Sequence, residues 1–547
     1  MDSSTWALFG TYAFILLVGG YALARYLYWV YEKPEPGRVE RVFYRAMKID
    51  AQTSMTGWLY AKSVLAFSVV GVALLVAIQR LQGILPLNPD HLGPVAWDLA
   101  LNTAVSFVTN TNWQAYSGEA TLSHLTQMVG LGTQNFVSAG AGMAVAVALA
   151  RGFRNRESSH LGNFWKDLTR GVLYVLVPLS LVLALVLVGE GVVQNFHATS
   201  DGIPGGPAAS QIAIKQLGTN GGGLFGVNSA HPFENPTPLS NFLQLLSILI
   251  IPAAFPFFFG RMIGRRKEGW LLFAVMGGVF ALSLAGSYWA ESQINPLTSL
   301  PYLEGKEMRF TQAESVLWGS ATTVASNGSV NSMHDSYSPI AGGLFLFNIM
   351  LGEVIFGGVG SGLYGMALFA ILTVFLSGLM VGRTPEYLGK KIESREIILS
   401  GVGALLPGLT ILLGTALAVV TEAGLKAVSN PGPHGLTQIL YAMTSAAGNN
   451  GSAFAGLGVN SPFYNLTLSA LMWVGRFGVI VPVLLLADSV GRKKLIAASP
   501  GTLPTASPLF GALLVAVILL VGGLTFFPAL MLGPVLEHGA MLRGIGF

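Results

Sequence analysis

Four short clusters of glycine, asparagine, threonine and serine contain the residues of this sequence that could do chemistry. Each cluster follows an apolar stretch that is too short to cross a membrane. Their backbone and side chains offer neutral oxygens, and glycine permits the left-handed backbone that turns successive carbonyls toward one line. A ring of such oxygens can replace the hydration shell of a monovalent cation. The candidate ligands are Asn110, Thr111, Asn112 and Gln114; Gly218, Thr219, Asn220, Gly221 and Gly222; Ala325, Ser326, Asn327, Gly328 and Ser329; and Gly448, Asn449, Asn450 and Gly451.

The clusters contain no carboxylate. Ca²⁺ and Mg²⁺ demand charged oxygen ligands, so this composition favours a weakly hydrated ion such as K⁺. Acidic residues elsewhere in the same loops would raise the cation concentration at the entrance. A single cluster of this kind is typical of an ordinary surface turn. Four clusters in corresponding places favour a shared ion site.

The clusters recur at a near-constant interval. Aligned on Asn112, Asn220, Asn327 and Asn450, they lie 108, 107 and 123 residues apart. Such a period indicates an internal repeat, in which each unit is a span, a short re-entrant helix, a polar segment and a second span. All units start on the same side of the membrane, which predicts four parallel repeats around one axis. The predicted units are 61–151, 170–260, 270–383 and 396–491, with an N-terminal helix and cytoplasmic loop at 1–60 and a C-terminal helix at 505–547.

The chain that positions these clusters is strongly apolar. Of its residues 52% are hydrophobic and 10% are charged, against about 25% charged in soluble domains. We therefore predict an all-α polytopic membrane protein whose K⁺-channel-like filter is surrounded by ten transmembrane helices. The first run has no basic segment before it and no small-residue cleavage site after it, so we interpret it as a retained helix. The ten runs are Trp6–Leu27, Val64–Ile84, Phe136–Ala150, Val172–Val188, Phe242–Phe259, Leu271–Trp289, Leu344–Val381, Ile397–Val420, Leu466–Ala487 and Leu509–Leu530.

Lysine and arginine are concentrated in alternate loops between these runs. Because cytoplasmic loops are the basic ones, both termini are expected on the extracytoplasmic side. The net charge of +4 is then explained by topology and needs no nucleic-acid partner. The absence of cysteine excludes disulfides and thiolate metal sites.

The seventh run, Leu344–Val381, is too long for one span. Its 38 residues would extend about 57 Å as a helix, against a hydrocarbon core of about 30 Å. Gly357, Gly358 and Gly360 lie in its middle, so we predict an interrupted helix whose irregular part lies beneath the filter and acts as a gate. A tilted, protruding helix is the alternative. Glu353, a carboxylate inside this run, is a functional candidate because charges at membrane depth are expensive.

Two arginines are further candidates. Arg476 lies inside the ninth run, where it either repels ions below the filter or pairs structurally with Glu353 or with helix carbonyls. Arg383 lies at the inner end of the seventh run, where a coupling role competes with simple positive-inside topology.

At these residues the sequence resembles the KdpA family, the potassium-translocating subunits of bacterial Kdp P-type ATPases, over essentially the whole chain. The resemblance implies a KdpB-like ATPase subunit, KdpC-like and small KdpF-like subunits, and a location in the bacterial inner membrane. It also implies that Gln114, Gly221, Ser329 and Gly451 affect affinity and that Arg383 and Arg476 affect coupling. The matching segments are Thr109–Gln114, Gly218–Gly223, Ser326–Ser329, Gly448–Ser452, Gly352–Gly360 and Gly382–Lys391.

The first hypothesis for function is therefore the K⁺-selecting subunit of an ATP-driven uptake complex. The sequence has no Gly-x-x-x-x-Gly-Lys-Ser/Thr loop, so a partner would bind the nucleotide. A gradient-driven transporter of the Trk or Ktr kind is the alternative, with the same filter physics. An intramembrane enzyme would need paired catalytic groups, and no His-Glu-x-x-His or Gly-x-Ser-x-Gly pattern accompanies Glu353 and Arg476.

Overall fold

The computed structural model describes residues 3–33, 35–199, 203–352, 354–382, 384–496 and 503–546. Among these residues ten helices are long and apolar enough to cross a membrane, which confirms the all-α polytopic fold. Each predicted run overlaps one of them. Their cores are α1 (Ser3–Glu32), α3 (Gly57–Leu81), α6 (Thr133–Arg154), α8 (Val177–Gly189), α10 (Pro238–Met262), α11 (Arg266–Glu291), α14 (Ser361–Val381), α15 (Ser394–Val420), α18 (Pro462–Gly491) and α19 (Pro508–Leu530).

Three of the long helices begin with the same local signal. Thr237, Ser461 and Ser507 each precede a proline, and each hydroxyl accepts a hydrogen bond from the backbone N–H three residues later. The hydroxyl satisfies a helix N–H that has no partner within the helix, and proline tolerates the first helical position because it has no N–H to lose. These caps fix where three of the spans start, two of them (α10 and α18) directly after outer loops.

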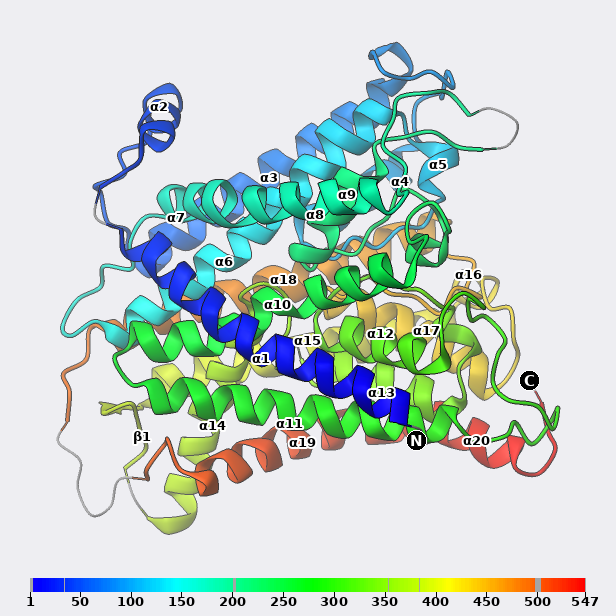
Figure 1. Ribbon diagram of the computed structural model, residues 1–547. Coiled ribbons are helices and arrows are strands. Elements are labelled where there is room, and N and C mark those ends of the chain that lie inside the picture. Colours follow the sequence, from blue (N-terminus) through cyan, green and yellow to red (C-terminus); the bar gives the residue numbers. More distant parts are fainter. Residues whose placement is uncertain are drawn as a thin grey trace.

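Four shorter helices lie within the outer loops: α4 (Trp97–Val108), α9 (Ala208–Leu217), α12 (Gln312–Val324) and α17 (Pro433–Ala447). At 1.5 Å per residue none reaches across a core of about 30 Å. Each packs between two spanning helices and is largely buried. In Figure 1 all four lie in the same half of the molecule as the two chain ends, while α2 (Arg38–Ala46) and β1 lie at the opposite end.

The long seventh run is interrupted, as predicted. It forms α13 (Pro339–Met350) and α14, separated by a non-helical segment at 351–360. Gly352, Gly357 and Gly360 have positive φ values there, which glycine adopts without a steric penalty. Phe356 also has a positive φ of 54°. We call residues 351–360 the interruption; Glu353, within it, lies outside the described residues.

A small antiparallel hairpin connects α14 to α15 at the basic end. Strand β1 (Glu386–Tyr387) pairs with β2 (Lys390–Lys391) in the register Glu386–Lys391 and Tyr387–Lys390. The remaining elements are short: α5 (Gly118–Thr121), α7 (Phe164–Arg170), α16 (Glu422–Leu425), α20 (Leu536–Met541), the 3₁₀ turns η1 (Gln82–Ile84), η4 (Asn228–Ala230) and η5 (His334–Ser336), and the π-helical stretches η2 (Thr126–Gly132), η3 (Gly171–Leu176) and η6 (Met531–Val535).

Candidate ion site

The four polar segments that follow α4, α9, α12 and α17 share one backbone geometry. Two residues after each helix ends, φ is positive, between 49° and 67°. The next residue donates its N–H to the carbonyl five positions earlier, at 2.8 to 3.1 Å. This bond folds the chain back over the end of its own helix. The donors are Thr111, Asn220, Asn327 and Asn450, and the acceptors are Ser106, Lys215, Thr322 and Ser445.

This geometry corrects the predicted alignment of the first segment by one residue. Thr111, not Asn112, makes the bond that Asn220, Asn327 and Asn450 make. Asn112 instead corresponds to Gly221, Gly328 and Gly451. It has φ 54°, and asparagine tolerates this region better than most residues with a side chain. The alignment was wrong because it matched residue types, whereas the register is fixed by the residue at which each helix ends.

The four segments close a ring in which each contacts its two neighbours. Between the first and second, the Asn110 amide donates to the Thr219 carbonyl at 3.1 Å. Between the second and third, the Gly328 N–H donates to the Asn220 carbonyl at 3.2 Å. A Cβ atom on Gly328 would lie 2.9 Å from the Gly451 carbonyl carbon, which places the third segment against the fourth.

The ring closes between the fourth and first segments. The Asn449 amide donates to the Thr111 hydroxyl at 2.9 Å, and a Cβ atom on Gly451 would lie 2.0 Å from the Thr111 carbonyl oxygen. Glycine is therefore required at 451 by both the close approach and its φ of 96°. Nearly every predicted ligand residue is buried; Gln114 and Gly451 are partly exposed. The structure thus brings the four predicted clusters together.

Gln114 connects the first two segments through its side chain. Its amide oxygen accepts from the Gly223 N–H and its amide nitrogen donates to the Gly223 carbonyl, both at 2.9 Å. Both polar atoms of the amide are therefore engaged with backbone. Sequence reasoning placed Gln114 among the ion ligands; its geometry is that of a brace between neighbouring segments.

Three hydroxyl residues that the sequence analysis missed support the segments from behind. Ser106 donates to the Trp113 carbonyl at 2.9 Å and Thr322 to the Ser329 carbonyl at 2.8 Å. Ser445 accepts from the Gly451 N–H at 2.9 Å. All three lie five residues before the aligned position of their segment. A repeat alignment in the correct register would have found them.

The interruption contacts the ring directly. The Gly357 N–H donates to the Val324 carbonyl at the end of α12, at 3.0 Å. The Val359 N–H donates to the hydroxyl of Thr219 in the second segment, at 2.9 Å. On its other side, a Cβ atom on Gly360 would lie 2.5 Å from the Gly142 carbonyl oxygen of α6. The interruption is thus held between the ring and a spanning helix, and Gly357, Gly358 and Gly360 are all buried.

Arg476 lines a cavity next to the ring. The cavity has a volume of about 30 Å³ and also borders Ser361, Tyr364 and Asn449. Arg476 is 7% exposed, and its Nη2 would lie 3.0 Å from a Cβ atom on Gly142. Arg476 therefore lies in α18 with its side chain in the interior of the bundle. Arg383, like Glu353, lies outside the described residues.

Comparison with known proteins identifies relatives of this chain. A family model described as "KdpA: Potassium-transporting ATPase A subunit" matches residues 10–538. A "Potassium-transporting ATPase potassium-binding subunit" of Sorangium cellulosum is 56% identical over 538 residues, which is 93% of each chain. One of Pseudomonas aeruginosa is 56% identical over 515 residues, 91% of each chain.

Among solved structures, the potassium transporter TrkH from Vibrio parahaemolyticus superposes with a TM-score of 0.53. The superposition covers 79% of this chain and 85% of that one, at 13% identity. At this identity the likeness concerns the fold alone.

Proposed function

This chain belongs to the KdpA family of potassium-transporting ATPase A subunits, and we propose that it selects extracytoplasmic K⁺ in the ring of four polar segments and passes it inward as the channel-like subunit of an ATP-driven uptake complex. The closed ring is the observation that carries this proposal. Irregular polar backbone among spanning helices is tolerated only where it is buried in protein or lines a water-filled cavity.

The ring offers the chemistry that K⁺ requires. Its oxygens are neutral carbonyls, hydroxyls and amides, and they come from four chain segments that meet at one place. Neutral oxygens bind a weakly hydrated monovalent ion without the charged ligands that a divalent ion needs. The eighteen candidate residues form this site, with Gln114 as a brace. The K⁺ ion is the cargo and no nucleotide binds to this chain.

The ion's further path requires the elements beneath the ring. The interruption, with Gly357, Gly358 and Gly360, is the gate, and Arg476 in the adjacent cavity stops ions from passing straight down, since a buried cation repels them. Glu353 and Arg383 complete the set of gate and coupling residues. ATP is hydrolysed on a KdpB-like partner, with KdpC-like and KdpF-like subunits in the same complex.

In this proposal the chain is a multi-pass protein of the bacterial inner membrane with both termini outside. The four units 61–151, 170–260, 270–383 and 396–491 surround the ring, and 1–60 and 505–547 flank them. A Trk-type transporter without an ATPase is the competing function, and the TrkH-like fold is what favours it. Purification of the chain from its native membrane separates the two. A co-purifying ATPase that forms a K⁺-stimulated phosphoenzyme supports the pump, and its absence favours the alternative.

A matched pair of glycine substitutions tests the ion site itself. A Cβ atom on Gly221 would lie 2.0 Å from the Gly328 backbone nitrogen, whereas a Cβ atom on Gly278 in α11 meets nothing within 4 Å. In cells that lack other K⁺ uptake systems, Gly221→Ala should raise the KM for K⁺ about tenfold, which corresponds to about 1.4 kcal/mol of ion-binding free energy. Gly278→Ala should leave it unchanged. Equal KM values, at equal amounts of protein in the membrane, contradict the assignment of the ring.

A further inference from the structure

The second short helix differs from the other three at one structurally equivalent position. Where α4, α12 and α17 have the hydroxyl residues Ser106, Thr322 and Ser445, α9 has Lys215. The three hydroxyls contact their own polar segments directly. A lysine at this position places a positive charge directly behind a ring that binds cations, and its ammonium group can donate hydrogen bonds but cannot accept one as Ser445 does.

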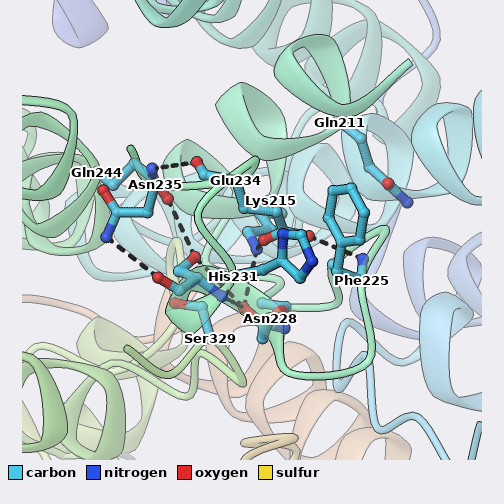
Figure 2. Close-up of polar contacts among 12 residues, drawn as sticks. Gln211, Lys215, Phe225, Asn228, His231, Glu234, Asn235, Gln244 and Ser329 are labelled. Carbon is cyan, nitrogen blue, oxygen red and sulfur yellow. Dashed lines mark hydrogen bonds and ion pairs between the residues drawn. The ribbon is translucent and has the colours of Figure 1, made fainter. Parts of the chain in front are cut away.

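The Lys215 side chain is completely buried and is held by two partners. Its Nζ lies 2.5 Å from Oε2 of Glu234, which is also completely buried, and 2.8 Å from Oδ1 of Asn228. The other Glu234 oxygen accepts from the Phe225 N–H at 3.0 Å. Figure 2 shows Lys215 between Glu234 and Asn228. A buried charge pair with its remaining atoms satisfied is the arrangement that avoids a large desolvation penalty.

The Asn228 side chain connects this ion pair to the ring. Its Nδ2 donates to the Gly221 carbonyl oxygen at 2.8 Å. Because the lysine ammonium can only donate, it requires the amide oxygen of Asn228 to face it, and the amide NH₂ must then face Gly221. The Ser229 N–H also donates to the Asn228 amide oxygen, at 2.9 Å. Lys215 and this N–H together fix the orientation of the amide that contacts the ring.

The Gly221 carbonyl differs from the carbonyls at the same position of the other three segments in its hydrogen bonding. Asn112, Gly221, Gly328 and Gly451 occupy the same position in the four segments, and in the described part of the chain only the Gly221 oxygen accepts a hydrogen bond from a side chain. A carbonyl that already accepts a hydrogen bond presents less negative charge to an ion. The balance between K⁺ and Na⁺ at a ring of carbonyls depends on the number and strength of the dipoles that the ion meets.

We propose that Lys215, Glu234 and Asn228 form a selectivity-tuning relay, in which the lysine-oriented Asn228 amide weakens one carbonyl of the ring and so favours K⁺ over the smaller Na⁺. The relay is a positioning device: none of its three side chains needs to touch the ion. The inference rests on the proposed function, since it assigns a role within that same ring.

The test uses two variants in the complete complex and compares uptake of K⁺ with uptake of Na⁺. Asn228→Leu removes the donor to Gly221. Lys215→Met with Glu234→Gln removes both charges and one of the two donors that orient the Asn228 amide. Both should lower the preference for K⁺ over Na⁺, by about tenfold for Asn228→Leu, where the hydrogen bond is lost outright. The control is Lys306→Met with Glu291→Gln, a similarly buried pair with side chains 4% and 0% exposed, which should leave the preference unchanged.

The ion preference separates a tuning role from a merely structural one. If both relay variants lower only the amount of protein or its thermal stability, and keep the wild-type K⁺/Na⁺ ratio, the relay is overturned. Gly221→Ala in the same assay distinguishes this result from failure of the proposed function. If Gly221→Ala changes the K⁺/Na⁺ uptake ratio and the relay variants do not, the relay is rejected and the ring is kept as the ion site. If none of these variants changes the ratio, both proposals are rejected.

Discussion

The hydroxyl oxygen of Thr219 accepts a hydrogen bond from the backbone N–H of Val359, at 2.9 Å. The same hydroxyl donates to the Gly218 carbonyl at 2.8 Å, so its orientation is fixed. One side chain thereby joins the second segment of the ring to the interruption between α13 and α14. The interruption cannot move away from the ring unless this bond breaks.

Thr219→Val should therefore loosen the interruption. Valine has nearly the same shape but leaves the buried Val359 N–H without a partner, at a cost of about 1–3 kcal/mol. Hydrogen exchange of the amides in the interruption should become about tenfold faster, and K⁺ transported per ATP should fall. Thr373→Val in α14 is the control, because among the described residues the Thr373 hydroxyl bonds only to the Phe369 carbonyl of its own helix. Unchanged protection in Thr219→Val would show that the bond does not hold the interruption.

Gln114 should affect K⁺ binding through its two hydrogen bonds to Gly223 in the second segment. In Gln114→Leu both bonds to Gly223 are lost, whereas Gln114→Glu keeps an acceptor for the Gly223 N–H and loses the donor to its carbonyl. We expect both variants to raise the KM for K⁺, with leucine causing the larger rise of about tenfold. Uptake kinetics at varied K⁺ measure this. A KM below the wild-type value with glutamate would indicate that the side chain faces the ion instead, because a carboxylate attracts the cation.

Lys390 should stabilise the end of the bundle opposite the ring. Its buried ammonium donates to the carbonyls of Gly152, Asn155 and Val490, at the C-terminal ends of α6 and α18. Lys390→Met leaves these carbonyls without a donor and should cost about 3 kcal/mol of stability. The neighbouring Lys391→Met removes only an exposed ion pair with Glu393 and should cost about 0–1 kcal/mol. Thermal unfolding of the purified protein compares the two, and equal losses would contradict the helix-end role.

His434 should make the attachment of α20 depend on pH. Burial alone would lower the pKa of His434, but its hydrogen bonds and charge interactions with Asp335 and Glu537 outweigh burial and raise the pKa from 6.5 to about 10. Because the folded pKa is the higher one, the stabilisation is fully present below pH 6.5, declines above it and is lost once the pH passes about 10. Unfolding scans of wild type and His434→Gln should converge at high pH. A constant difference across this range would refute the protonated pair.

The spans and the interruption could be predicted from sequence because both depend on local properties. Twenty apolar residues match the membrane thickness, and Gly357, Gly358 and Gly360 in an overlong run predict the break. The register of the first polar segment could not be predicted this way. It depends on α4 ending at Val108, and helix ends are poorly marked in sequence.

The contacts of Lys215 with Glu234 and Asn228 could not be predicted from local sequence patterns either. Lys215 is one of the few basic residues of the outer loops and Glu234 is one of many acidic residues there, so their types alone do not predict that they pair. Their pairing depends on how 218–233 folds back over α9, a stretch without helical or strand periodicity. The bidentate contact of Gln114 with Gly223 is likewise set by the meeting of segments about a hundred residues apart.

The position of the bound ion tests the central claim most directly. Rb⁺ has nearly the size of K⁺ and scatters X-rays anomalously, so crystals of the complete complex grown with Rb⁺ would reveal its site. The account predicts an anomalous peak enclosed by Thr111, Asn220, Asn327 and Asn450, where the four segments meet. A peak elsewhere in the protein, with nothing between these residues, would contradict it.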